Sequence, residues 1–489
     1  MRKLVLMILG WFLFHPIFAQ PGLVFKTEAL QNAGCSVYVI DADDSKVLFA
    51  TPQVSLVPAS VMKIVTTATA LEILGADFVF HTQLGITGKV STTTGALEGN
   101  LVLKGGCDPA FYSGYFSEHY KGTFEAWAQA LSKAGVKSIK GDFIIDLSHF
   151  PGSSIPGGWL WEDIGNYYGA GISALTYSDN FYKIHFSSSA KPDIPVTISC
   201  IEPNIDSLVL INKVVSSDIN GDLAVIYGAP GSYSQIVEGT IPKKRPDFIV
   251  KGAMPNPAKM AATDFLKVLK SNNIEILGKV RYINTPLIEN VEQIADKSSP
   301  PLRDLIIPLN QESINLFAEH LLIEIGRAKK DSPLLVNCVT AITEFWKEKN
   351  IFTQGFYPTD GSGLSRSNGI CPRTLAEILH FMYLSPNREV FFNSLPVAGK
   401  SGTLQFAFKD SKLENNLKAK TGSMSRVKSM AGIFTNQSGK KVIFAIILNN
   451  FEGSQASISR LIEEFLGNIY SLEPVSEKKQ SLINYIPIF

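Results

Sequence analysis

The chain has 489 residues, more than one ordinary hydrophobic core accommodates, and this length indicates two or three domains. With 45% hydrophobic and 18% charged residues, the composition is that of a globular protein. The 45 Lys and Arg residues are balanced by 44 Asp and Glu residues, so the basic excess typical of nucleic-acid-binding proteins is absent. We therefore expect no nucleic-acid partner.

The first twenty residues, MRKLVLMILGWFLFHPIFAQ, have the pattern of a secretory signal. A basic start precedes an apolar run over residues 4–14, which is too short to cross a bilayer, and a cleavage site follows at Ala19. No cysteine follows this site, which disfavours a lipoprotein, and no later stretch is long and apolar enough to be transmembrane. We expect residues 1–19 to be removed as a signal peptide and the mature protein to be exported.

The next stretch predicts two strands and a helix. CSVYVIDADDSKVLFA indicates strands around a polar turn, and a helix is expected from near Ser60 to Gly75. Lys63 lies in the apolar run of this helix, on the same face as Ser60. A buried lysine costs free energy unless it is paired or loses its proton, and a neutral lysine is a general base. The pair is thus a candidate nucleophile and base, with a Lys63 that extends to the surface as the open alternative.

Ser-x-x-Lys also occurs four more times, in segments that suit chemistry less well. These matches lie at strand edges, after a strand, in a turn or in a polar tail, and begin at Ser188, Ser425, Ser438 and Ser476. Only the match at Ser60 begins a well-patterned buried helix.

The middle of the chain contains a weak internal repeat. WAQALSKAGVKSIKGDFIID (127–146) and DFLKVLKSNNIEILGKVRYIN (264–284) both predict a helix, a short break and a strand entered through glycine. Such units could pair in one domain that encloses the strand-rich residues 177–255, although chance similarity stays open.

Two further segments carry candidate site residues. Ser313 and Asn315 stand at the start of an amphipathic helix, where plain helix capping is the alternative interpretation. Lys420-Thr421-Gly422 is predicted on an edge strand before the hairpin MAGIFTNQSGKKVIFAIILNN, and a C-terminal helix follows. A cation and a hydroxyl beside a glycine suit the recognition of a substrate carboxylate. The competing match Lys400-Ser401-Gly402 has a loop-like context.

The five cysteines are too few and too widely spread to form a disulfide framework. Buried free thiols are the simplest interpretation, with one disulfide pair as the alternative, for Cys35, Cys107, Cys200, Cys338 and Cys371. No histidine pair has the spacing of a zinc site on a helix, so we expect no metal and no cofactor.

The order of the three motifs at Ser60, Ser313 and Lys420 resembles that of penicillin-binding proteins and serine β-lactamases. The long gap between the first two motifs is similar to that of the class C low-molecular-mass penicillin-binding proteins, the D-alanyl-D-alanine carboxypeptidase/endopeptidase family. The stretches KGGCDPAF, YGAGISAL, DGSGLSR and LPVAGKSGTL also match. Two positions depart from the family pattern, since Cys107 replaces a frequent glycine and Lys400 occupies a usually uncharged place.

The resemblance implies a serine DD-peptidase that acts on peptidoglycan stem peptides and is acylated by β-lactam antibiotics. Ser60 would attack the carbonyl between two D-alanines, and Lys63 would take the serine proton. Ser313 would relay a proton to the leaving amine, Asn315 would hold a substrate amide, and Lys420 would lower the pKa of its neighbours.

The resemblance also implies two binding sites. Thr421 and Ser423 would bind the terminal carboxylate beside Gly422, and the N–H groups of Ser60 and Ser423 would form the oxyanion hole. A pocket for a diaminopimelate-like side chain would comprise Asp146, Arg366 and Ser425. For Asp146 the alternative is a solvated residue at a strand end.

By this resemblance we expect an α+β, penicillin-binding-protein/β-lactamase-like transpeptidase fold with two inserted smaller domains. Its catalytic domain would be an antiparallel sheet flanked by helices, plus an all-helical part. The expected division is a signal peptide at 1–19, a catalytic domain at 20–85 and 286–489, domain II at 86–176 and 256–285, and domain III at 177–255. By analogy the mature protein is periplasmic.

Three alternatives are weighed against a DD-peptidase. A serine β-lactamase of one class uses a Glu-x-x-Leu-Asn loop, and the nearest match, at 162–166, has glycine for leucine and precedes the Ser-x-Asn motif. A Ser-His-Asp hydrolase would carry a Gly-x-Ser-x-Gly elbow, which is missing. A non-catalytic wall-binding protein would not need a buried base, yet all three motifs are intact.

Overall fold

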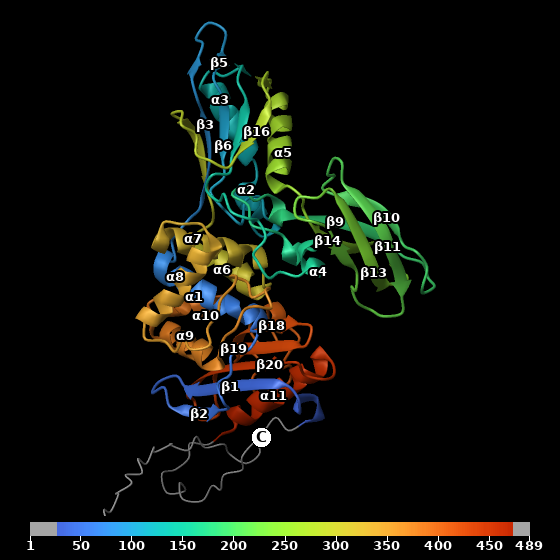
Figure 1. Cartoon of the computed structure of the whole chain (residues 1–489), viewed down its shortest axis with the longest axis vertical. Coiled ribbons are helices and arrows are strands. Elements are labelled where there is room, and N and C mark those ends of the chain that lie inside the picture. The colour runs from blue at the N-terminus through green and yellow to red at the C-terminus, as the bar shows by residue number, and fades with distance from the viewer. Residues whose placement is uncertain (1–26, 473–489) are drawn as a thin grey trace, which may run out of the picture.

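The computed structural model describes residues 27–472, which form an elongated molecule of three parts (Figure 1). The catalytic domain lies at one end, domain II at the opposite end, and domain III projects to one side. The predicted signal peptide lies outside the described residues. Among the described residues, no helix has the length and hydrophobicity needed to cross a membrane.

The catalytic domain contains a five-stranded antiparallel sheet in the order β18-β19-β20-β1-β2. The strands are β1 (Gly34–Asp41), β2 (Val47–Ala50), β18 (Lys418–Met424), β19 (Val427–Thr435) and β20 (Lys441–Asn449). Both predicted hairpins are confirmed. Because β1 pairs with β20 along its whole length, the two ends of the chain share one sheet.

Helix α11 (Gln455–Tyr470) packs on one face of this sheet. Its apolar stripe, which includes Ile458, Phe465 and Leu466, forms a common core with inward-facing residues of β1 and β20. The predicted C-terminal helix is therefore confirmed, and burial of its stripe is what holds it to the sheet.

The other face supports an all-helical part with α1 buried at its centre. The helices are α1 (Met62–Leu74), α6 (Leu302–Gln311), α7 (Asn315–Lys330), α8 (Leu335–Glu348), α9 (Pro372–Leu384) and α10 (Arg388–Ser394). The first ten residues of α1 are all buried, as expected for a helix that is apolar on every side. A buried helix of this kind gives Lys63 no route to the surface.

Domain II is built from two sheets and two longer helices. The larger sheet, β16-β8-β6-β3-β17, has strands at Val280–Ile283, Phe143–Asp146, Leu101–Lys104, His81–Ile86 and Glu292–Ser298; the smaller sheet, β15-β7-β5-β4, has strands at Glu275–Ile276, Ser138–Ile139, Ala96–Glu98 and Lys89–Val90. Helices α3 (Thr123–Lys133) and α5 (Pro257–Ser271) contact each other. The pairing predicted from the internal repeat is confirmed, because β15 runs parallel to β7 and β16 runs parallel to β8.

Domain III consists of two three-stranded sheets packed on a shared apolar core. The sheet β10-β9-β14 has strands at Thr197–Glu202, Phe181–Ser187 and Phe248–Ala253, and the sheet β11-β13-β12 has strands at Val209–Ser217, Ser234–Pro242 and Val225–Tyr227. Alternating side chains of β9, namely Tyr182, Ile184 and Phe186, fill the core, which is the pattern of strands with one buried face.

The sheet of domain II extends past two of the expected domain boundaries. Strand β3 begins at His81, before residue 86, and its partner β17 lies beyond residue 286. We therefore propose that both strands belong to domain II and that the catalytic domain resumes after β17.

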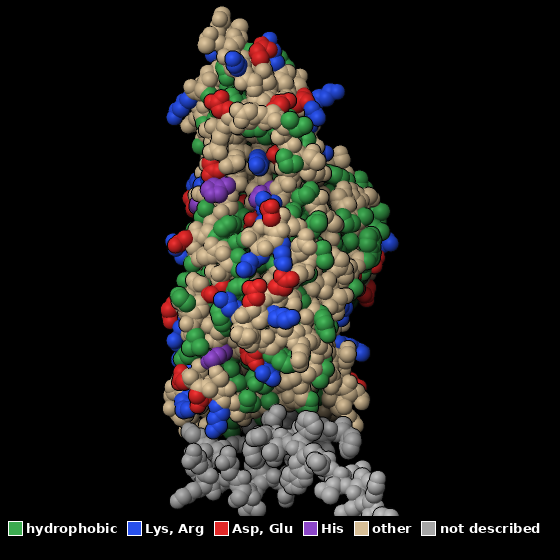
Figure 2. All heavy atoms as spheres, turned by 60° about the vertical axis from the view of Figure 1, so that its left-hand side comes forward, with side chains coloured by type: hydrophobic (Ala, Val, Ile, Leu, Met, Phe, Trp, Pro, Cys, Tyr) green, Lys and Arg blue, Asp and Glu red, His purple; other side chains and the backbone are tan. Residues whose placement is uncertain are grey.

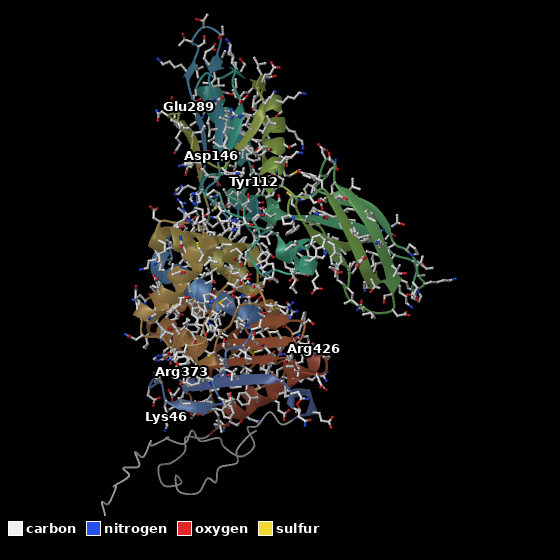
Figure 3. All side chains as sticks on the ribbon, in the orientation of Figure 1. Lys46, Tyr112, Asp146, Glu289, Arg373 and Arg426 are labelled. Atoms are coloured by element: carbon white, nitrogen blue, oxygen red, sulfur yellow. The ribbon has the colours of Figure 1, made fainter. Side chains whose placement is uncertain are left out.

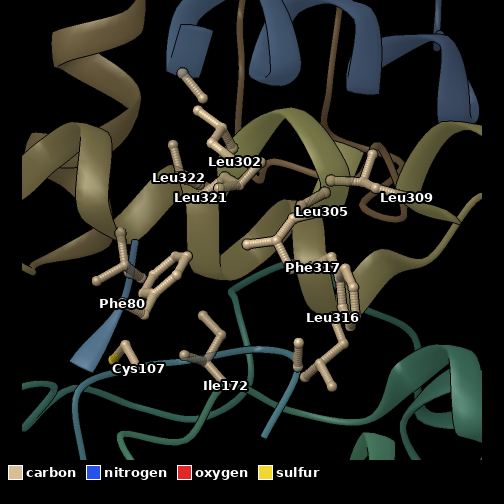
Figure 4. Packing of buried hydrophobic residues seen from close by; sticks show 14 of the residues in the cluster. Phe80, Cys107, Ile172, Leu302, Leu305, Leu309, Leu316, Phe317, Leu321 and Leu322 are labelled. Carbon is tan, nitrogen blue, oxygen red and sulfur yellow. The ribbon is translucent and has the colours of Figure 1, made fainter. Parts of the chain in front are cut away.

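Catalytic domain and domain II share one continuous apolar core. Figure 4 shows Leu316 and Phe317 of α7 facing Ile172, and Phe80 and Cys107 lying beside the same helices. All five residues are buried. Domain II is therefore packed directly against the catalytic domain and is not joined to it by flexible linkers alone.

The surface and the cysteines agree with the composition. Figure 2 shows Lys and Arg side chains interspersed with Asp and Glu side chains on the face that it draws. All five cysteines are free thiols in the described structure, and Cys107, Cys338 and Cys371 are buried.

The crossing of α7 and α8 supplies a test of the packing. A Cβ atom on Gly326 would lie 2.2 Å from Cys338 Sγ and 2.9 Å from its Cα, so Gly326→Ala forces the two helices apart. We expect a loss of about 1–3 kcal/mol, measured as a lower midpoint of thermal unfolding.

The matched control is Gly467→Ala in α11, where nothing lies within 4 Å of the added Cβ. Higher helix propensity should stabilise this variant by up to about 1 kcal/mol. Equal midpoints for the two variants would contradict the packing described for α7 and α8.

Candidate active site

Ser60 and Lys63 lie together where β18 meets the start of α1. Ser60 belongs to a 3₁₀ turn (Ala59–Val61) that leads directly into α1, and Lys63 lies in the first turn of that helix. Lys63 Nζ is 3.0 Å from Ser60 Oγ. The helical spacing inferred from the sequence thus brings the two side chains into hydrogen-bond contact.

Lys63 is fully buried and has three oxygen neighbours. Besides Ser60 Oγ, its Nζ lies 2.6 Å from Asn315 Oδ1 and 2.8 Å from the Ser362 carbonyl. Burial lowers the pKa of Lys63 to about 7, while the charges of Asp360 and Glu319 act to raise it. A substantial neutral fraction is therefore present near neutral pH.

The three oxygens around Lys63 Nζ can satisfy the amine in either protonation state. The charged ammonium donates one hydrogen to each oxygen, Ser60 Oγ included. In the neutral amine, Asn315 Oδ1 and the Ser362 carbonyl, which act only as acceptors, take the two hydrogens, and the lone pair is left for the hydroxyl of Ser60.

The second and third motifs meet through a hydrogen bond between Ser313 and Lys420. Ser313 lies between α6 and α7 with a φ of 60°, and Lys420 Nζ donates to Ser313 Oγ at 3.0 Å. Lys420 is fully buried, and burial together with the charge of Lys63 holds its pKa well below the usual value. Helix α7 begins at Asn315, two residues after Ser313. Ser313 thus lies in the turn before the helix, slightly ahead of the expected helix start.

Two buried carboxylates that the sequence analysis did not single out shape the loop at 360–366. Glu319, four residues after Asn315 on α7, accepts from the N–H groups of Gly361 and Ser362 at 3.0 and 2.8 Å. Asp360 accepts from Gly363 N–H at 2.7 Å and Ser365 N–H at 2.6 Å. These bonds fix the Ser362 carbonyl against Lys63. The sequence feature that could have pointed to Glu319 is its i, i+4 spacing from Asn315, which places both side chains on one face of α7.

Strand β18 runs directly beside Ser60, and only glycine fits at position 422. A Cβ atom there would lie 2.9 Å from Ser60 N and 2.8 Å from the Pro58 carbonyl. Ser423 follows on this strand and accepts from Lys428 Nζ at 3.0 Å, while Thr421 Oγ1 lies 2.8 Å from Thr403 Oγ1. Lys428 belongs to the Ser-x-x-Lys match that begins at Ser425. The turn at 425–426 brings it into antiparallel register with Ser423, so its side chain contacts Ser423 and not Ser425.

A cleft of about 470 Å³ opens at Ser60 and is lined by all three domains. Arg366 and Ser425 lie in its wall, and Arg366 Nη1 is 3.4 Å from the Ser425 carbonyl. Two of the three residues expected for the side-chain pocket are therefore brought together.

The structure does not bring Asp146 to this cleft. Figure 3 labels it within domain II, and its buried carboxylate accepts from Ser148 N–H at 2.9 Å. It lines a separate cavity of about 220 Å³, because the end of β8 faces the sheet of domain II and not the catalytic domain. The expected grouping of Asp146 with Arg366 therefore does not occur.

Asp163 of domain II lies in the cleft instead. It is half-buried in the short helix α4 (Trp161–Ile164), where burial raises its pKa and the charge of Arg366 opposes that rise. In the sequence, this segment stands out only as the imperfect Glu-x-x-Leu-Asn match at 162–166. No spacing rule links a residue of an inserted domain to Arg366, more than 200 positions away.

The loop after α4 also reaches the catalytic residues. The carbonyl of Tyr168 accepts from Asn315 Nδ2 at 2.8 Å, which orients the amide so that Oδ1 faces Lys63. A segment of domain II thus completes the surroundings of Lys63.

One cluster of potential metal ligands occurs among the described residues, away from the cleft. The ligand atoms of Cys107, His149 and Glu324 all lie within 4.8 Å of one another. Glu324 is already engaged, since His149 Nε2 lies 2.7 Å away and Arg327 3.9 Å away. These residues come from distant segments, so sequence spacing could not reveal the cluster.

Comparison with solved structures confirms the expected fold class. Penicillin binding protein 4 (dacB) from Haemophilus influenzae superimposes with a TM-score of 0.79 at 24% identity, over 91% of this chain and 98% of that chain. The same protein complexed with a β-lactam superimposes with a TM-score of 0.72 at 22% identity.

Comparison of sequences identifies the family. A D-alanyl-D-alanine carboxypeptidase of an Actinomadura species is 27% identical over 465 residues, which cover 91% of this chain and 84% of the relative. The D-alanyl-D-alanine carboxypeptidase DacB of Haemophilus influenzae is 27% identical over 403 residues, which cover 81% of each chain. The profile of one family matches residues 23–465, nearly all of the described structure. The chain therefore belongs to the D-Ala-D-Ala carboxypeptidase 3 (S13) family of serine-type peptidases.

Proposed function

We propose that Ser60 is the nucleophile with which this enzyme cleaves the D-Ala-D-Ala bond of peptidoglycan stem peptides, and that Lys63 is its base. The observation that carries the proposal is the 3.0 Å contact between Lys63 Nζ and Ser60 Oγ, with the other two neighbours of Nζ acting only as acceptors. Lys63 takes the hydroxyl proton as Ser60 Oγ attacks the carbonyl carbon, and the tetrahedral intermediate collapses to an acyl-enzyme with release of D-alanine.

The leaving amine needs a proton, and Ser313 with Lys420 is placed to supply it. Lys420 Nζ donates to Ser313 Oγ, whose own hydroxyl proton is free to pass to the amine. Water then attacks the acyl-enzyme along the same route in reverse, returns the proton to Ser60 and releases the shortened peptide.

The substrate would be held along β18. Ser60 N lies against the backbone of Gly422, so the N–H groups of Ser60 and Ser423 are near enough to act as a joint oxyanion hole. Thr421 and Ser423 supply hydroxyls for the terminal carboxylate, with the positive charge of Lys428 beside Ser423.

A diaminopimelate-like side chain carries an amine and a carboxylate, and the cleft offers a partner for each. Asp163 and Arg366 line the same wall, and we propose that they bind the amine and the carboxylate respectively. Asp163 takes the place that the sequence analysis gave to Asp146.

We further propose that the enzyme works outside the cytoplasm, where peptidoglycan is found. The pattern of residues 1–19 supports this location. β-Lactams would acylate Ser60, by analogy with the relative whose β-lactam complex is known.

Acylation by benzylpenicillin tests the nucleophile. After brief exposure, intact-protein mass spectrometry should show one adduct per chain, and peptide mapping should place it on Ser60; Ser60→Ala should show none. Labelling of another residue would refute the assignment of Ser60, and rapid drug turnover without an adduct would indicate a β-lactamase.

The pH dependence of acylation tests Lys63. The neutral amine is the base, so the second-order rate of acylation should fall about tenfold per pH unit well below pH 7 and level off above it. Replacement by alanine should lower the plateau by about 10²-fold or more.

Asp360→Asn gives the matched control for this profile. The charge of Asp360 raises the pKa of Lys63, so its removal should move the acid limb to lower pH, whereas Glu319, whose own pKa burial raises to about 8, carries little charge along that limb. If the acylation rate of Lys63→Ala still fell below pH 7 as in the wild type, a group other than Lys63 would cause this pH dependence.

Asp163→Asn and Asp146→Asn separate the two candidate acids of the side-chain pocket. Loss of a charge-assisted hydrogen bond should raise the KM of the Asp163 variant for a diaminopimelate-containing peptide about tenfold or more. A peptide with an acetylated side-chain amine should be unaffected, and so should the Asp146 variant with either peptide. If instead the Asp146 variant no longer distinguished the free amine from the acetylated amine, Asp146 would be the residue that binds the amine.

A further inference from the structure

The cleft continues past Asp163 to a wall built from both inserted domains. Tyr115 and Tyr167 of domain II are 48% and 50% exposed there, and Phe181 and Lys251 of domain III complete the wall. Lys251 Nζ lies 5.5 Å from the ring centroid of Tyr167 and 4.9 Å from that of Phe181. A cation is thus held over aromatic faces at the far end of the site.

Lys251 forms no ion pair within the described part of the chain, although a carboxylate lies in the same region. Asp179 also lines the cleft: its Oδ2 accepts from Gly114 N–H at 3.0 Å, its Oδ1 has no hydrogen-bond partner, and burial raises its pKa while the charge of Lys251 acts to lower it. No ion pair joins these two described side chains, so the ammonium of Lys251 can pair with an external anion, with Asp179 as the competing carboxylate within the chain. Aromatic walls exclude water and strengthen such a pairing relative to one in bulk solvent.

A purely structural role for Lys251 is not needed to hold domain III in place. Strand β14 is fixed to domain II by a backbone hydrogen bond from Ala253 N–H to the Gly165 carbonyl at 2.9 Å. Ile226 N–H of domain III adds a bond to Asn166 Oδ1 at 3.0 Å. Replacing the side chain of Lys251 leaves both bonds intact.

The position of the subsite indicates which part of a substrate would reach it. Under the proposed function the terminal carboxylate lies by Thr421 and Ser423 on β18, and the diaminopimelate-like side chain lies by Asp163 and Arg366. The wall of Tyr115, Tyr167, Phe181 and Lys251 includes none of these residues, so it is left for the part of the peptide that precedes the diaminopimelate-like residue.

The geometry points to a distal subsite in which Lys251 binds a carboxylate of the residue preceding the diaminopimelate-like residue, with Tyr115 and Tyr167 packing against the peptide. This inference rests on the proposed function and names the additional substrate segment that the inserted domains recognise. It gives domain III a direct part in the choice of substrate.

Three synthetic peptides test the subsite. One ends in D-Ala-D-Ala and has a free carboxylate on the residue before diaminopimelate, the second has that carboxylate amidated, and the third begins at diaminopimelate. The wild-type kcat/KM should be about tenfold higher for the first peptide than for the other two, as expected for one charge-assisted contact. Lys251→Met should abolish this difference and leave the third peptide unaffected, whereas Lys251→Arg should keep the difference.

Lys213→Met is the matched control, since Lys213 is an exposed lysine of domain III outside the cleft. It should behave as wild type with all three peptides. An equal loss for all peptides in Lys251→Met, or discrimination that survives in this variant, would overturn the subsite. Failure of the proposed function would look different, because the third peptide would not be cleaved and benzylpenicillin would not label Ser60.

Discussion

The active site depends on keeping one amine, Lys63 Nζ, out of water among three oxygens. Those oxygens come from the turn before α1, from α7 and from the loop at 360–366, so the contact joins three segments that are distant in sequence. An unpaired charge in this position would be costly, and the protein meets the problem by lowering the pKa of Lys63 to about 7. The burial that lowers this pKa thus also gives Lys63 the neutral form that the proposed base needs.

The inserted domains contribute to this arrangement more directly than their distance from the catalytic sheet suggests. Domain III is bonded to the loop at 165–168 through β14, and the carbonyl of Tyr168 in that loop holds the amide of Asn315. Asn315 in turn faces Lys63. Hydrogen bonds and the short backbone segment 165–168 thus connect domain III to Lys63, the proposed base.

Local patterns predicted the parts of the structure that local physics decides. The hairpins, the buried helix α1, the edge strand bearing Lys420 and the paired repeat units of domain II follow from periodicity, turn residues and motif order. The positions of Asp163 in the cleft and of Glu319 and Asp360 beside Lys63 could not be predicted, because they arise from tertiary packing. Asp146 was chosen for its resemblance to the family pattern, yet its strand end lines a separate cavity of domain II.

The charge of one buried lysine acts on the other, because the positive charge of Lys63 lowers the pKa of Lys420. In the proposed reaction, a proton that Lys63 takes from Ser60 would therefore make Lys420 a stronger acid. Lys420 already donates to Ser313, which is the route proposed toward the leaving amine. In that scheme, uptake of a proton by Lys63 favours its release from Lys420, so no net charge would accumulate in the buried site as the acyl-enzyme forms.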